Sequence, residues 1–194
     1  MLLEEEKTKN QFSKLTNRWN SGSLKWEIKE NELPMWVADM DFETAPEIIE
    51  ALKQRVEHGI FGYNIVPDEF FESIQTWWLK RHNYYLEKEW MLFCTGVVPA
   101  ISSLVRKMTS VGENILIQAP VYNIFYNSIL NNGRHIISSD LIFDGKEYYI
   151  DFVDLEMKLA DPQTTMMILC NPHNPIGKIW DIESLERIGE MCAK

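Results

Sequence analysis

The 194-residue sequence has only three cysteines, Cys94, Cys170 and Cys192, and they are far apart in the chain. No two of them form a CxxC pair. A disulfide framework or a zinc knuckle needs closely and regularly spaced cysteines, so neither is expected. Free thiols fit a reducing compartment, and no metal site is predicted.

Long hydrophobic runs and the pattern of a secretory leader are also missing. The first residues, MLLEEEKTKN, are acidic where a signal peptide is basic and then apolar. No apolar run approaches the roughly 20 residues that span a bilayer. We therefore expect a cytoplasmic protein that does not enter a membrane.

Positive charge is scarce, with 19 basic against 29 acidic side chains and a formal net charge of −10. Nucleic acids and anionic lipids bind broad basic surfaces, so neither is an expected partner. A small acid or zwitterion is compatible with this composition, because a local site can oppose the net charge. The sequence also lacks GxGxxG, GxxxxGK[ST], GxSxG and HExxH, which excludes the common dinucleotide, P-loop, hydrolase-elbow and zincin motifs.

The composition, 45% hydrophobic and 12% aromatic, predicts a globular protein of one domain, or one domain plus a piece of another. Residues 1–43 carry large aromatics through turn-like sequence and are predicted to form an arm, and residues 44–194 the domain. A helix is expected to begin with the capping box T-A-P-E at 44–47 and to stop at Gly59. A second helix is expected to open at Pro67, with an apolar stripe packed against the core.

From residue 90 onward, short apolar runs alternate with segments of helical periodicity. The runs are WMLFCTG, NILIQAP, HIISSDL and TTMMILCNP. This alternation predicts an α/β fold with a mainly parallel sheet. Ligands of such sheets bind where strands end and helices begin, which singles out residues 95–96, 120–122 and 171–177.

The first of these junctions is predicted to turn through Gly96 into a helix. The first free N–H groups of that helix would be those of Val97 and Val98, and a phosphate suits them because orphan donors and the helix dipole both favour an anion. An ordinary βα turn without a ligand is the alternative. At the second junction, Tyr122 follows Pro120 and offers a flat ring that could cover a flat ligand. A half-buried packing tyrosine is the alternative there.

The third junction, NPHNPIG at 171–177, is the most specific element of the sequence. Proline disfavours helix in the residue before it, so Asn171 and Asn174 are both expected to be extended. An amide held in this way can donate to one chosen oxygen. Asn-Pro pairs also occur in ordinary turns, but two of them after an apolar run and before Gly177 favour a binding function.

The N-P-x-N-P-x-G pattern resembles that of the pyridoxal-phosphate enzymes of the aminotransferase class I/II superfamily, fold type I. NRWNSGSLKWE, PMWVADMDF, FGY, TGVVPAI, PVYNIFY and NPHNPIGKIW follow the order and spacing of the cystathionine β-lyase branch, the MalY/PatB-type C–S lyases. The resemblance covers about residues 15–194. It implies an N-terminal arm followed by the first part of a fold type I large domain.

The resemblance also implies roles for individual residues. Gly96 and the backbone N–H groups of Val97 and Val98 would hold the phosphate of pyridoxal 5'-phosphate, PLP. Tyr122 would stack on its pyridine ring, and Asn174 would hydrogen-bond the phenolic oxygen of that ring and help to orient the substrate.

Two further residues have implied roles in the first part of the chain. Tyr63, in FGY, would reach the cofactor phosphate of the neighbouring subunit, so the expected partner is a second copy in a homodimer. Ala38 would lie beside the substrate carboxylate through its backbone. Trp36 and Asp39 receive no chemical role.

The resemblance implies β-elimination from a sulfur-containing amino acid such as cystathionine, with release of thiol, pyruvate and ammonia. An aminotransferase is the alternative enzyme, and a truncated binding or regulatory module is the alternative outside enzymes. The family's Schiff-base lysine would come after Lys194, so the chain is expected to be a catalytically incomplete N-terminal fragment. Lys178 is interpreted as a surface lysine.

Overall fold

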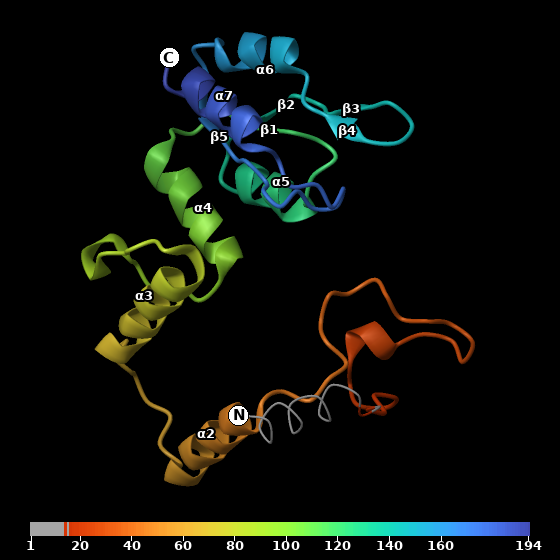
Figure 1. Cartoon of the computed structure of the whole chain (residues 1–194), viewed down its shortest axis with the longest axis vertical. Helices are drawn as coiled ribbons and strands as arrows, with labels where there is room; N and C mark the ends of the chain where they lie inside the picture. Colours follow the sequence, from red (N-terminus) through yellow and green to blue (C-terminus); the bar gives the residue numbers. More distant parts are fainter. Residues whose placement is uncertain (1–13, 15) are drawn as a thin grey trace. The chain divides into compact units, whose positions relative to one another are not determined.

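The computed structural model describes residue 14 and residues 16–194 (Figure 1). The acidic segment 1–10, in which no secretory leader was expected, lies outside the described residues. Two compact units divide the described chain, one extending to Ile65 and the other running from Val66 to Lys194. The boundary expected at residue 43 falls inside the first unit. No described helix is both long and apolar enough to cross a membrane.

The second unit contains a three-stranded parallel sheet with the strand order β2-β1-β5. These strands are β1 (Asn114–Ile117), β2 (His135–Ser138) and β5 (Thr164–Met167). β1 pairs in parallel with both neighbours. The predicted α/β class with a parallel sheet is therefore confirmed.

Helices cover both faces of this sheet, as Figure 1 shows. On one face lie helices α4 (Val97–Met108) and α5 (Asn123–Leu130), and on the other α6 (Phe152–Leu159) and α7 (Ile182–Cys192). Because successive side chains of a strand point to opposite faces, β1 has to be apolar on both. All four of its residues are buried, which explains the apolar run ILI at 115–117.

Two separate cores follow from this alternation. Ile115 and Ile117 are fully buried against the α4 and α5 side, together with Val105, Phe125 and Ile129. Leu116 points the other way, to Leu155 of α6 and Ile188 of α7.

The helices of the second unit begin in two different ways. Asp151 caps α6 by accepting hydrogen bonds from the N–H groups of Val153 and Asp154, and Asp181 caps α7 by accepting from the N–H of Ser184. Such caps satisfy N–H groups that have no partner inside the helix. α4 begins at Gly96 without a side-chain cap.

A small antiparallel hairpin was not predicted from the sequence. It consists of β3 (Ile142–Phe143) and β4 (Tyr148–Tyr149). Its turn contains Gly145 in the left-handed region, with φ of 98°, and Asp144, whose Oδ1 accepts from the N–H groups of Lys146 and Glu147. The Asp-Gly pair was the available signal, because these residues favour tight turns.

The first predicted helix forms as α2 (Pro46–His58), but its expected capping box is wrong. The N-cap residue is Ala45 and not Thr44; its carbonyl oxygen accepts from Ile48 and Ile49 N–H, and its own side chain makes no cap hydrogen bond. Proline is favourable in the first turn without such a cap, since it has no N–H to satisfy. The predicted end is confirmed, with Gly59 at φ of 71°.

The second predicted helix forms as α3 (Asp68–His82) with Pro67 as its N-cap, but its stripe lies outside the two cores. Phe70, Trp77 and Trp78 are 40%, 56% and 42% exposed. Among the contacts of the stripe is Phe93, whose ring meets that of Phe70 edge-on at 5.6 Å. Sequence periodicity identified the apolar face but not what covers it.

The predicted strand at WMLFCTG is also wrong. A short 3₁₀ turn, η2 (Lys88–Trp90), forms there, and residues 91–96 follow it without strand pairing among the described residues. A second 3₁₀ turn, η1 (Leu24–Trp26), lies in the first unit. A segment forms a β-strand only when a neighbouring strand pairs with its backbone, and an apolar sequence alone does not provide such a neighbour.

We expect Leu155→Ala to lower the free energy of unfolding by about 2–5 kcal/mol, because it opens a cavity between α6, α7 and β1. Val153→Ala on the same helix is the matched control, since Val153 is 79% exposed and its loss should change stability by at most about 0.5 kcal/mol. Urea unfolding followed by circular dichroism measures both. Equal losses in the two variants would contradict this description of the core.

Candidate functional site

The three predicted junctions of the second unit lie at one edge of the sheet. β1 and β5 are adjacent and parallel, so residues 118–122 and 168–174 leave the sheet at the same edge. Helix α4 precedes β1 with a short connection and packs against it, so the helix runs back along the strand and its first turn lies toward that edge. One hydrophobic core, including Ile101, Val121 and Cys170, underlies all three junctions.

A buried histidine joins two of these junctions. His173, the central residue of NPHNP, is 1% exposed, and its Nε2 lies 3.0 Å from the carbonyl oxygen of Pro120. Burial lowers the pKa of the His173 imidazole, opposed in part by the carbonyls of Pro120 and Gln118. Sequence reasoning missed this residue, because the middle position of the motif carries no pattern that predicts burial.

The asparagines of the motif lie in different environments. The Oδ1 of Asn171 accepts a hydrogen bond of 3.1 Å from the N–H of Trp180, so this side chain stabilises the turn. The backbone N–H of Asn174 donates to the Sγ of Cys170 at 3.3 Å. The Asn174 side chain is exposed and has no hydrogen-bond partner among residues 16–194. Its amide is therefore free to bind a ligand.

Tyr122 is the N-cap residue of α5, and its side chain is 42% exposed. Its ring meets Phe125 edge-on, with centroids 6.2 Å apart. Phe125 is buried in the core, so this contact supports the Tyr122 ring from one side and leaves much of it accessible.

The first turn of α4 presents unpaired donors. Gly96 is extended, with φ of 161° and ψ of 170°, and the N–H groups of Val97 and Val98 have no acceptor among the described residues. Pro99 has no N–H, and the N–H of Ala100 already donates to the Gly96 carbonyl at 3.2 Å. The free donors of this turn are thus those of Val97 and Val98, at the positive end of the helix dipole.

Lys178 is held more firmly than a free surface lysine. Its side chain is 28% exposed, and Nζ donates to the carbonyl oxygen of Tyr148 at 2.5 Å. Nζ also lies 4.7 Å from the ring centre of Tyr149 and 5.4 Å from that of Trp180. These contacts attach the β3–β4 hairpin to the turn at 171–177, a structural role that sequence reasoning did not identify.

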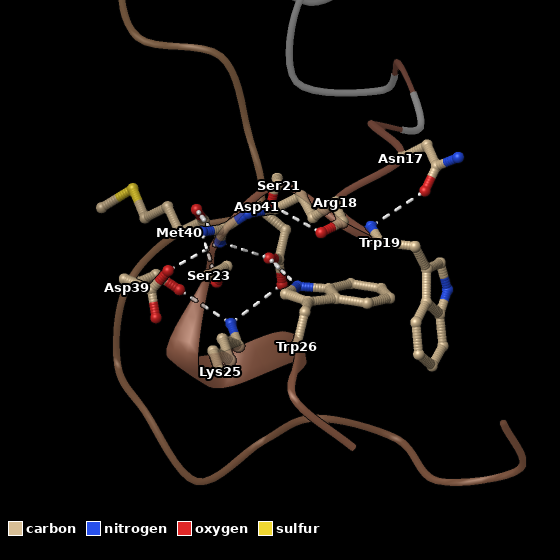
Figure 2. Close-up of polar contacts among 10 residues, drawn as sticks. All are labelled: Asn17, Arg18, Trp19, Ser21, Ser23, Lys25, Trp26, Asp39, Met40 and Asp41. Carbon is tan, nitrogen blue, oxygen red and sulfur yellow. Dashed lines mark hydrogen bonds and ion pairs between the residues drawn. The ribbon is translucent and has the colours of Figure 1, made fainter. Parts of the chain in front are cut away.

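The first unit contains a cluster of charged residues that folds the arm on itself (Figure 2). Asp41 receives hydrogen bonds from Arg18 at 2.7 Å, from Lys25 at 2.8 Å and from the indole N–H of Trp26 at 2.8 Å. Arg18 also contacts Asp39 at 2.6 Å. WVADMDF thus pairs its aspartates with the basic residues of NRWNSGSLKW, which gives Asp39 the role that the sequence left open.

These contacts shift the ionisation of both partners. Lys25, then Trp26 and Arg18, hold the pKa of the Asp41 carboxyl well below its usual range. Asp39 and Asp41 raise the pKa of Arg18. A carboxyl whose pKa is lowered in the folded state stabilises that state fully above its ordinary pKa, here 3.8, and loses the effect as the pH falls below it. The arm is therefore expected to loosen in acid.

The remaining predicted residues belong to the first unit. Ala38 is exposed and directly precedes Asp39 of the charged cluster. Tyr63 lies in an irregular segment after α2, with its side chain fully exposed. Of the predicted site residues, Gly96, Val97, Val98, Tyr122 and Asn174 thus belong to the second unit, and Ala38 and Tyr63 to the first.

The junctions of the second unit suit a flat ligand that carries an anionic group. Two free backbone donors at the start of α4 favour the anion, the Tyr122 ring offers a stacking face, and the Asn174 amide offers a donor and an acceptor. These features define an α/β protein with a candidate ligand site at the carboxyl edge of its parallel sheet.

Comparison with known proteins identifies the family. The model of the aminotransferase class I and II family matches residues 31–194. The chain belongs to this family.

Two curated relatives and one solved structure are similar over most of the chain. Cystathionine beta-lyase PatB of Bacillus subtilis (strain 168) is 44% identical over 188 residues, and Protein MalY of Escherichia coli (strain K12) is 34% identical over 190 residues. These matches cover 93% and 94% of this chain but 48% and 49% of the relatives. Cystalysin of Treponema denticola, solved with a pyridoxal 5'-phosphate cofactor, is 34% identical, with a TM-score of 0.85 over 94% of this chain and 48% of its own. The chain therefore spans about half the length of the relatives it matches.

We expect Asp41→Asn to speed backbone hydrogen exchange in residues 18–41 at neutral pH, because the neutral amide weakens the contacts to Lys25, Trp26 and Arg18. Glu43→Gln is the matched control, since it removes a solvent-exposed ion pair of 2.8 Å to Lys14. Exchange monitored by mass spectrometry compares the two. Unchanged exchange in Asp41→Asn would rule out the cluster as the contact that holds the arm.

Proposed function

We propose that this chain supplies the N-terminal half of a PLP-dependent C–S β-lyase of the cystathionine β-lyase type. The observation that carries the proposal is the contact between His173 and Pro120, which brings the turn of Asn174 next to the turn of Tyr122 at the sheet edge where α4 presents its free donors. The names of the relatives support the reaction class, since PatB is a cystathionine beta-lyase and a PLP-bound C–S lyase from Staphylococcus hominis is 30% identical.

The phosphate of PLP fits the start of α4. The N–H groups of Val97 and Val98 are unpaired and point away from the helix, and Gly96 keeps the approach free of a side chain. The donors act locally through the helix terminus, so they can bind an anion despite the net charge of −10.

The ring of PLP fits between the other two junctions. Stacking on Tyr122 would contribute about 0.5–1.5 kcal/mol beyond the burial of apolar surface. The side-chain N–H of Asn174 would donate to the phenolic oxygen of the ring and fix its orientation. When bound, PLP supplies an electron sink for the charge left after Cα of the substrate loses its proton. The residues of this chain bind and orient the ring.

Two residues of the first unit also have proposed roles, which rest on the resemblance to the family. The backbone of Ala38 would lie beside the substrate carboxylate, with the neighbouring Asp39 tied to Arg18. Tyr63 would extend to the cofactor phosphate of a second copy in a homodimer, which its full exposure allows. In this scheme residues 1–43 form the arm, and residues 44–194 form the first part of the large domain.

The proposed reaction eliminates the β-thiol of a sulfur-containing amino acid such as cystathionine. The Cα proton and the C–S bond are lost, and water then converts the remaining unsaturated amine to pyruvate and ammonia. An aminotransferase is the second candidate, because histidinol-phosphate aminotransferase of Listeria monocytogenes is 27% identical over 122 residues. Both reactions would use the same cofactor contacts.

We expect Asn174→Ala in the full gene product to raise the dissociation constant for PLP about tenfold, because one hydrogen bond to the ring is lost. Asn127→Ala is the control, since Asn127 is an exposed residue of α5 away from the motif. Visible absorbance after titration and dialysis measures retention. Wild-type protein that retains no PLP would refute the proposed function.

We expect the full gene product, loaded with PLP and given cystathionine, to release thiol and pyruvate in equal amounts without a 2-oxo acid. A β-elimination needs no amino-group acceptor, whereas transamination stops after one turnover without it. A thiol reagent and a coupled pyruvate assay follow the products. Turnover that requires a 2-oxo acid and releases no thiol would favour the aminotransferase.

A further inference from the structure

His173 is buried although the turn around it is exposed. Its side chain is 1% exposed, while the flanking residues 171–172 and 174–175 are all exposed. The imidazole meets the ring of Trp180 edge-on, with centroids 5.7 Å apart and an interplanar angle of 85°. Burying a polar ring costs free energy unless its nitrogens are hydrogen-bonded, so the hydrogen bonds of the His173 ring must offset the cost of its burial.

The contact with Pro120 determines which ring nitrogen carries the hydrogen. Nε2 lies 3.0 Å from the Pro120 carbonyl oxygen, and a carbonyl oxygen can only accept. Nε2 therefore carries the hydrogen and donates it. Nδ1 is then an acceptor, and it has no partner among residues 16–194. Burial lowers the pKa of the ring, so the neutral form with a single N–H is favoured.

Backbone hydrogen bonds hold the main chain of His173 in place. The N–H of His173 donates to the carbonyl of Lys178 at 2.7 Å, and its carbonyl accepts from the N–H of Gly177 at 2.8 Å. These bonds close the turn that carries Asn174. Pro120 lies two residues before Tyr122, so the His173 side chain connects the turn that carries Asn174 to the turn that carries Tyr122.

We propose that His173 is a positioning residue that sets the spacing between the Tyr122 ring and the Asn174 amide through its Nε2–H bond to Pro120. The inference rests on the proposed function, in which those two side chains contact PLP. Neither has a hydrogen-bond partner among the described residues, so each follows the backbone of its own turn. If the Asn174 turn moved relative to the Tyr122 turn, the two side chains could no longer contact PLP at the same time. Binding sites tolerate little displacement of this kind.

Three variants of the full gene product test this role through the dissociation constant for PLP. His173→Phe keeps an aromatic ring against Trp180 but removes the donor, and should raise the constant about tenfold. His173→Gln keeps an N–H donor and should remain within about threefold of wild type. His135→Phe is the matched control, because His135 is an exposed residue of β2, and it should change the constant less than about twofold.

A double variant separates positioning from general destabilisation. If His173 acts through Asn174, then His173→Phe should raise the constant less than about threefold when Asn174 is already alanine. A tenfold rise in that background would overturn the proposal. So would equal binding by wild type and His173→Phe, or equally weak binding by the Gln and Phe variants.

A measurement on wild type completes the test, whether or not the Phe variant folds. ¹⁵N NMR of histidine-labelled protein should show the His173 ring neutral at pH 7 with its hydrogen on Nε2. A hydrogen on Nδ1 alone would overturn the proposed bond. Failure of wild type to bind PLP would overturn the proposed function and this inference together, whereas tight wild-type binding that His173→Phe leaves unchanged would overturn only the inference.

Discussion

The burial of β1 on both faces is the constraint on which the second unit depends. Ile115 and Ile117 need one apolar cover and Leu116 another, so helices must lie on both sides of the sheet. A strand in this position also needs hydrogen-bonding neighbours on both edges, which β2 and β5 supply. Parallel neighbours in turn require crossover helices, and crossover helices bring their first turns to the carboxyl edge of the sheet. The location of the candidate site is thus a consequence of the way the strand is buried.

Hydrogen bonds then add the detail that hydrophobic burial cannot supply. The core beneath α4, α5 and Cys170 brings three junctions to one edge, but apolar contacts do not set the direction of a turn. The His173 ring does so between two of them, and Lys178 attaches the hairpin to the same turn. Buried polar contacts of this kind need exact partners, so they fix one arrangement where packing alone would tolerate several.

The first unit is held together by a different kind of interaction. Its described part contains no sheet, and the arm folds around a cluster in which Asp41 receives three donors. Charge-assisted hydrogen bonds can order a short irregular segment that buries little apolar surface. They also make that order depend on pH, because the carboxylate must stay ionised.

The sequence alone predicted the α/β class, the parallel sheet, the end of α2 at Gly59 and the start of α3 at Pro67. It also contained the motif that indicated the family. These features are local: hydrophobic period, proline and glycine geometry, and residues in a fixed order. The capping box at 44–47, the strand at 90–96 and the core packing of α3 were wrong, because each depends on a partner that local sequence does not specify. Only the tertiary structure revealed the burial of His173, the ion pairs of Asp41 and the anchoring of Lys178. These features depend on contacts between residues that are distant in the chain. The partners of His173 and Lys178 are also backbone carbonyls, which carry no sequence signal.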